Sequence, residues 1–153
     1  MKQLESLVVA ETEIGDRGLE LLVGLPRLKS LNLAETLVTD NGLQHLADAS
    51  GLTTLILDKT QITGADLQWL RLLKKLETLT LALTRIGDDQ LGILAELPQL
   101  KTVSLAGLPI SDDALEALMK LENLRTVNLS FTRISPQGIR QLQAKRPGLT
   151  IRH

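Results

Sequence analysis

Residues 76–99, LETLTLALTRIGDDQLGILAELPQ, decide the fold because their apolar positions recur every 24 residues in both directions. The first leucine of each copy stands at Leu4, Leu28, Leu52, Leu76, Leu100 and Leu124. We number six units from these leucines, and positions within a unit from 1 to 24. This period predicts an array of stacked units, and residues 1–153 are expected to form a single domain.

The first half of each unit alternates apolar and polar residues. Positions 1, 4 and 6 are apolar, as in Leu76, Leu79 and Leu81, and the residue between the last two is polar or small in most units. This alternation predicts a short strand with one buried face. In five units, Thr at position 9 is followed by Ile or Val at position 11. That pair predicts a tight corner where the hydroxyl bonds backbone groups and the aliphatic residue enters the core.

The second half of each unit changes its period. Leu91, Leu94 and Leu97 lie three residues apart, which places them on one side of a helix of about three turns. Ser, Thr or Gly followed by Asp precedes the helix, as in Gly87 and Asp88. We expect the first residue to cap the helix and the carboxylate to occupy its first turn. Paired aspartates at this point are therefore interpreted as capping residues and not as metal ligands.

A strand and a helix every 24 residues cannot bury their apolar faces alone, whereas stacked copies share one core. The predicted product is a curved α/β solenoid with a parallel sheet on the concave face and helices on the convex face. The curvature follows because helices are wider than strands. A terminal strand near residues 149–151 is expected to end the array, with Lys145, Arg146 and Arg152 at its polar edge.

The pattern LxxLxLxxTxIxDxxLxxLxxLxx covers essentially the whole chain and resembles a leucine-rich repeat. Its helical half is similar to the ribonuclease-inhibitor-like and cysteine-containing subtypes. The segment LVTDNGL at 37–43 is similar to arrays in bacterial proteins of unassigned function. The resemblance implies a right-handed β-α superhelix and a non-enzymatic scaffold for protein–protein interaction.

The corner departs from that family because Thr stands where Asn is usual. A hydroxyl both donates and accepts, so we expect a ladder of hydroxyls along the stack in place of the amide ladder. Leu108 replaces this Thr in the fifth unit, and Pro109 removes a backbone N–H. The fifth corner is therefore expected to be locally altered.

The composition excludes several function classes. The formal net charge is −1, with 17 basic and 18 acidic residues, so no overall field attracts nucleic acid or an anionic membrane. Cysteine is absent, and the chain has one Phe, one Trp and no Tyr, which argues against thiol chemistry and against stacking of single-stranded nucleic acid. We expect no enzyme, cofactor, metal site, nucleic acid or membrane contact, and a soluble protein in the cytoplasm.

Positions 8 and 10 lie at the rim beyond each strand. Position 8 is acidic at the N-terminal end of the array and apolar toward the C-terminal end. An exposed aromatic residue beside arginine is typical of an interface anchor, so we expect an acidic-hydrophobic partner segment here. The predicted partner-binding residues are Leu83, Arg85, Gly107, Leu108, Phe131 and Arg133. The alternative is that Phe131 folds over the corner of its own unit.

Other surfaces leave further functions open. The concave face, at positions 3, 5 and 7, carries small and hydroxyl-bearing residues and is also expected to contact the partner. The N-terminal unit carries no polar cap over Leu4, Leu7 and Val9. This predicts either a segment of a longer protein or an assembly module that forms homo-oligomers through the N-terminal edge. An inhibitor-type regulator that occludes a partner enzyme is a further alternative.

Overall fold

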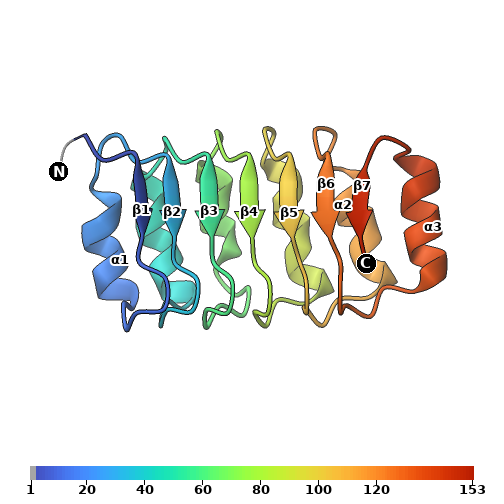
Figure 1. Ribbon diagram of the computed structural model, residues 1–153, viewed down its shortest axis with the longest axis horizontal. Coiled ribbons are helices and arrows are strands. Elements are labelled where there is room, and N and C mark those ends of the chain that lie inside the picture. The colour runs from blue at the N-terminus through green and yellow to red at the C-terminus, as the bar shows by residue number, and fades with distance from the viewer. Residues whose placement is uncertain (1–2) are drawn as a thin grey trace.

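The computed structural model describes residues 3–153 and contains seven parallel strands in one sheet (Figure 1). The strands follow one another in chain order, and each pairs with the next at a register step of 24 residues. The last strand lies one residue later than expected. The strands are β1 Ser6–Val8, β2 Ser30–Asn32, β3 Thr54–Ile56, β4 Thr78–Thr80, β5 Thr102–Ser104, β6 Thr126–Asn128 and β7 Thr150–Arg152.

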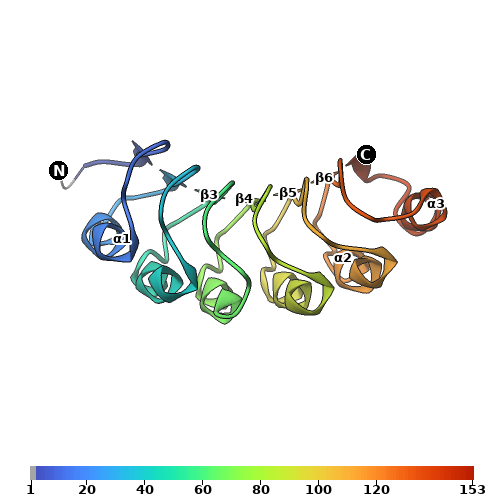
Figure 2. The same ribbon diagram turned by 90° about the horizontal axis from the view of Figure 1, so that it is seen from below.

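Helices form the second layer and lie on the convex side of the curved array, while the sheet lies on the concave side (Figure 2). Units 2 to 4 form 3-10 helices. Three residues per turn align Leu91, Leu94 and Leu97 on one face, which suits the observed spacing. The expected α/β solenoid is confirmed. The helices are α1 Asp16–Val23, η1 Asp40–Asp48, η2 Leu67–Leu72, η3 Asp88–Glu96, η4 Asp112–Ala114, α2 Leu115–Met119 and α3 Pro136–Lys145.

The core lies between the two layers and consists of stacked aliphatic side chains. Leu31 in β2 and Leu33 directly after this strand are fully buried, as is Leu43 from η1. Trp69 on the convex side is partly buried and packs against this core. Each interior unit therefore buries its strand and helix residues against the neighbouring units.

The corner hydroxyls bond within their own unit. Thr36 Oγ1 donates to the carbonyl oxygen of Leu33 at 2.7 Å. The equivalent hydroxyls also donate to the carbonyl oxygen three residues earlier in the chain, and they belong to Thr12, Thr60, Thr84 and Thr132. The expected hydroxyl ladder between units is therefore wrong. Backbone N–H groups make the inter-unit bonds instead, such as Arg85 N to Ile62 O at 3.0 Å.

The fifth corner keeps the turn but loses hydrogen bonds. Leu108 N donates to Leu105 O at 3.2 Å, as the corresponding Thr84 N donates to Leu81 O at 3.3 Å. Leu108 has no hydroxyl for the second bond, and Pro109 has no N–H to offer the preceding unit. The expected alteration therefore concerns the bonding and not the backbone path.

Four aspartates join neighbouring units. Asp40 accepts hydrogen bonds from Thr63 N at 2.9 Å, Thr63 Oγ1 at 2.7 Å and Gly64 N at 2.9 Å. Burial opposes ionisation of Asp40, but these donors outweigh it and lower its pKa. The corresponding pairs are Asp16 with Thr39, Asp88 with Ser111 and Asp112 with Ser135. Asp16, Asp88 and Asp112 thus reach the N-cap residue of the next helix, and Asp40 reaches residues shortly before the next helix. The sequence had predicted contact of each carboxylate with its own helix.

Unit 3 interrupts this series because Gly64 stands at the aspartate position. Gly87 N then donates to Gln90 Oε1 of its own unit at 2.9 Å. A Cβ on Gly64 would stand 2.6 Å from Gln90 Cγ, so the Gln90 side chain lies over the glycine. The junction between units 3 and 4 is therefore closed by packing and a local cap.

Candidate functional site

The rim row at position 8 has an unusual backbone conformation. Its residues leave the strands in the left-handed region, with φ between 55° and 70°. The non-glycine members all have exposed side chains. The corner therefore presents one side chain per unit outside the core. The row consists of Glu11, Glu35, Lys59, Leu83, Gly107 and Phe131.

The charges along this rim are distributed unevenly. Glu35 and Lys59 form an ion pair at 2.6 Å across neighbouring units. The hydrogen bond and the negative charge of Glu35 raise the pKa of Lys59. Within residues 3–153, by contrast, Arg85 and Arg133 take part in no ion pair, although both are exposed. Free cationic charge therefore gathers at units 4 to 6.

Leu83 occupies the space beside Gly107. A Cβ on Gly107 would stand only 2.5 Å from Leu83 Cδ2, so the leucine side chain lies directly over the glycine. Leu83 nevertheless remains 55% exposed. We define the rim patch as Leu83, Arg85, Gly107, Phe131 and Arg133.

Two expectations about this patch need correction. Leu108 is only 1% exposed and belongs to the core, because its position is the inward-facing one that Thr holds in the other corners. It therefore offers no surface to a partner. Phe131 is 93% exposed, so the alternative that it folds over its own unit is wrong.

A hollow of about 300 Å³ lies at the C-terminal end of the array, beside Phe131. It was not predicted from the sequence. We call it the end hollow. Its apolar lining comes from Leu129, Phe131, Ile134, Pro136 and Ile139, and its polar lining from Thr132, Arg140, Gln143 and His153.

The charge of the surrounding segment also escaped the sequence reasoning, although the sequence contains the signal. Residues 124–153 hold no acidic residue, whereas the chain as a whole is nearly neutral. We call this segment the basic cap. One of its residues, Arg146, donates to the carbonyl oxygens of Met119, Leu121, Glu122 and Leu124 and so closes the preceding turn. The six basic residues are Arg125, Arg133, Arg140, Lys145, Arg146 and Arg152.

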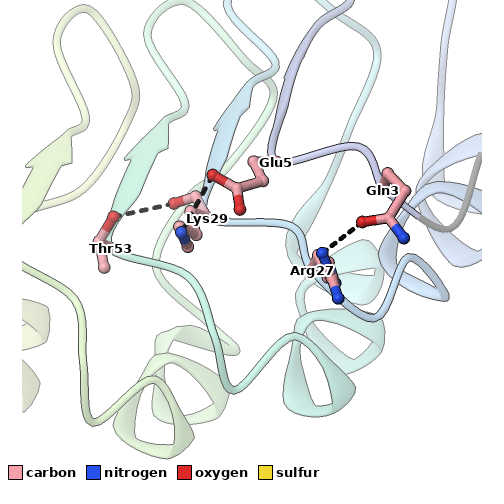
Figure 3. Close-up of polar contacts among 5 residues, drawn as sticks. All are labelled: Gln3, Glu5, Arg27, Lys29 and Thr53. Carbon is pink, nitrogen blue, oxygen red and sulfur yellow. Dashed lines mark hydrogen bonds and ion pairs between the residues drawn. The ribbon is translucent and has the colours of Figure 1, made fainter.

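A second hollow, of about 410 Å³, lies where the chain enters β2 and β3. Its cations are largely engaged. Lys29 pairs with Glu5 at 3.0 Å, and Arg27 donates to Gln3, while Thr53 bonds to the carbonyl oxygen of Lys29 at 3.1 Å (Figure 3). Lys75 also lines this hollow and takes part in no ion pair within residues 3–153. The lining differs from that of the end hollow in containing an acidic residue, Glu5.

The concave face is shallow, and several of its polar groups are engaged locally. Asn32 Oδ1 accepts from Ala34 N at 3.0 Å, and Asp58 Oδ1 accepts from Ala82 N at 2.7 Å. Among the described residues, the Oγ1 atom of Thr80 is buried without a partner. Small side chains and locally satisfied groups leave this face without large anchor side chains, so a partner lying on it would be anchored from the rim.

The described part of the chain, residues 3–153, contains no group of three or more His, Cys, Asp or Glu side chains arranged to hold a metal ion. It also contains no helix of the length and apolarity needed to cross a membrane.

Comparisons with known proteins agree with the architecture. A family profile described as Leucine Rich repeat matches residues 2–23 and 120–142. A leucine-rich repeat protein of Leptospira interrogans is similar, with a TM-score of 0.73 and 20% identity over 99% of this chain and 38% of that chain. An internalin of Listeria monocytogenes is similar, with a TM-score of 0.68 and 21% identity over 94% of this chain and 46% of that chain. The chain thus spans less than half the length of each, and no curated protein sequence matches it.

Proposed function

Because the chain has the fold of leucine-rich repeat proteins and two of its segments match that family's profile, we propose that it is a non-enzymatic scaffold that binds a protein partner through its concave face and the rim patch. Repeats of this kind generally serve as interaction modules. The partner segment proposed for the rim patch is acidic and hydrophobic. Its apolar side chains pack on Leu83 and Phe131, and its carboxylates pair with Arg85 and Arg133.

The observation that carries this proposal is the exposure of Phe131. A phenylalanine that is 93% exposed makes almost no contribution to the core of its own chain. Arg133 follows it by two residues, is exposed, and has no ion-pair partner within the described residues. Aromatic residues and arginine dominate the energetics of protein interfaces. An exposed pair of these types is therefore better suited to a partner than to folding.

Selection from a random peptide library on the immobilised protein tests the proposal. We expect enriched peptides to combine Leu or Phe with Asp or Glu. Phe131→Ala and Arg133→Glu should each weaken their binding about tenfold, because interface anchors contribute more than about 1 kcal/mol each.

Glu11→Ala is the matched control for Phe131→Ala. Both residues hold position 8 with nearly the same φ, 57° and 60°, so the backbone cost of each change to alanine is the same. The control should bind the peptides like the wild type. Undiminished binding by Phe131→Ala and Arg133→Glu, or enrichment of peptides without acidic residues, would refute the proposal.

A second candidate, self-association through the N-terminal face, is favoured by the exposure of unit 1. Leu7 and Val9 are partly exposed, whereas Leu31 and Leu33 at the same positions in unit 2 are fully buried. Val8 is 66% exposed. Light scattering across a concentration series tests this self-association. A molecular mass that rises with concentration in the wild type and stays constant in Val8→Lys supports it. A constant mass of the wild type excludes it. An inhibitor-type role and a cytoplasmic location stay predictions.

A further inference from the structure

The end hollow differs from the equivalent space between interior units because its position-11 residue stays accessible. Ile86 and Ile110 hold this position in units 4 and 5 and are fully buried, whereas Ile134 in unit 6 is only partly buried and lines the hollow. Ile139 and Pro136 from α3 complete the apolar wall. Unit 6 therefore offers an apolar receptor that interior units do not have.

The size of the hollow limits its occupant. A volume of about 300 Å³ lies at the lower end of the range of ligand pockets. It has room for one large apolar side chain. Because Phe131 stands at its edge and is almost wholly exposed, that side chain would contact a ring as well as the aliphatic wall.

The charge around the hollow fixes the chemistry beside that side chain. Arg140 lines the hollow, and Arg133 follows Phe131 by two residues. No acidic residue of the basic cap competes for these guanidinium groups. Long-range attraction and local pairing therefore both favour carboxylates next to the inserted side chain.

We infer that the end hollow is the anchor site of the partner segment: it holds one Leu- or Phe-type side chain, and the basic cap holds the flanking carboxylates. This inference rests on the proposed function and names the pocket and the residue types within it. An aliphatic wall with one ring offers nucleic acid few stacking surfaces. A peptide is therefore favoured over a polyanion bound by charge alone.

The test uses two synthetic peptides, Asp-Glu-Leu-Phe-Asp-Glu and Asp-Glu-Ser-Ser-Asp-Glu, which carry equal charge. Each is titrated into isotope-labelled protein, and backbone amide shifts are followed by NMR. We expect shifts at Thr132, Ile134 and Arg140, and about tenfold tighter binding of the Leu-Phe peptide because only it can bury apolar surface. A single-stranded oligonucleotide serves as the polyanion control.

Variants distinguish the end hollow from the rest of the rim patch. Gln143→Trp fills the hollow from an exposed position, and Arg140→Glu reverses its charge. Both should weaken the Leu-Phe peptide about tenfold. Arg85→Glu, in the rim patch but outside the hollow, should weaken it less than Arg140→Glu does. Arg71→Glu, at an exposed position outside both, is the control and should change the affinity less than about twofold. Thermal unfolding of each variant checks that the fold is kept.

The outcomes separate the two proposals. Shifts confined to Leu83 and Arg85, with loss of binding in Arg85→Glu only, would overturn the end hollow and leave the rim-patch function standing. Equal affinity of the two peptides, or tighter binding of the oligonucleotide, would reduce the basic cap to a site for anions and overturn the inference. A failure of library selection together with the absence of any shift would overturn both.

Discussion

Two adjacent carboxylates, of which only one bonds the next unit, provide a direct test of how units are joined. Asp88 accepts hydrogen bonds from Ser111 N at 2.9 Å and Ser111 Oγ at 3.0 Å in the next unit. Asp89 is exposed and accepts no side-chain bond from the described residues. Both lie in the first turn of η3 and share its dipole. Comparing Asp88→Ala with Asp89→Ala therefore isolates the inter-unit bonds.

The expected magnitude follows from the groups left unpaired. Replacing a capping carboxylate by alanine costs about 0.5–2 kcal/mol, and Asp88→Ala also leaves the partly buried Ser111 N–H without an acceptor. We expect a loss of about 1.5 kcal/mol in the free energy of unfolding for Asp88→Ala. Asp89→Ala loses only its dipole interaction, about 0.5 kcal/mol. The first change should lower Tm by about 3–6 °C.

Urea unfolding followed by circular dichroism at neutral pH measures both changes. The double variant Asp88→Ala with Ser111→Ala completes a cycle. Its coupling energy should exceed about 0.5 kcal/mol because the two side chains share the bond from Ser111 Oγ, whereas the bond from the backbone N–H is kept in Ser111→Ala. Equal losses for Asp88→Ala and Asp89→Ala, or a coupling energy near zero, would refute the claim that these aspartates hold neighbouring units together.

Three further changes test particular contacts. Folding lowers the pKa of Asp40, so the stabilisation of the fold by its carboxylate is complete above roughly pH 4 and is lost as pH falls through the folded-state pKa. Asp40→Asn should therefore make the free energy of unfolding, measured by circular dichroism, depend less on pH in acid. Gly64→Asp restores the repeat pattern yet should lower stability by about 1–2 kcal/mol in urea titrations, because φ is 99° and Cβ would clash with Gln90. Gly107→Ala should lower Tm for two reasons, the positive φ of 70° and the clash of the new Cβ with Leu83. Truncating Leu83 in the same chain should recover only the share of the Tm loss that the clash causes.

The sequence predicted the architecture well because the repeat period determines it. A constant step of 24 residues sets the strand register, and β4 pairs with β5 at that step, Thr78 with Thr102. Buried positions such as Leu79 follow from the alternation within each strand. Periodicity therefore specifies which residues face the core and which strands are neighbours.

The partners of individual polar groups could not be predicted from the period. A threonine hydroxyl can bond its own turn or the next unit, and the choice depends on distances that spacing does not supply. Asp40 shows the opposite case, since it reaches forward to Thr63 although its place in the sequence suits a cap on its own helix. The direction of these bonds is a property of the packed stack.

The candidate site was predicted only in part for the same reason. Spacing placed Leu83 and Phe131 on one rim, and both are exposed. Spacing also grouped Leu108 with them, although its position faces inward. The end hollow depends on how α3 packs beside the last corner, which no repeat pattern describes. The charge of the basic cap was readable from the sequence but is hidden in the near-neutral total.

At position 8 the fold determines the backbone conformation but not the identity of the side chain. Five of its six residues are not glycine, yet φ lies between 55° and 60° in each of them, where an L-residue costs roughly 1 kcal/mol more than glycine. Gly107 shows that the same corner accepts glycine with φ of 70°. The turn therefore does not require the side chains at this position. Since these side chains change from acidic at Glu11 to aromatic at Phe131, their identity reflects surface chemistry, and the binding proposals belong at the rim and the C-terminal end of the array.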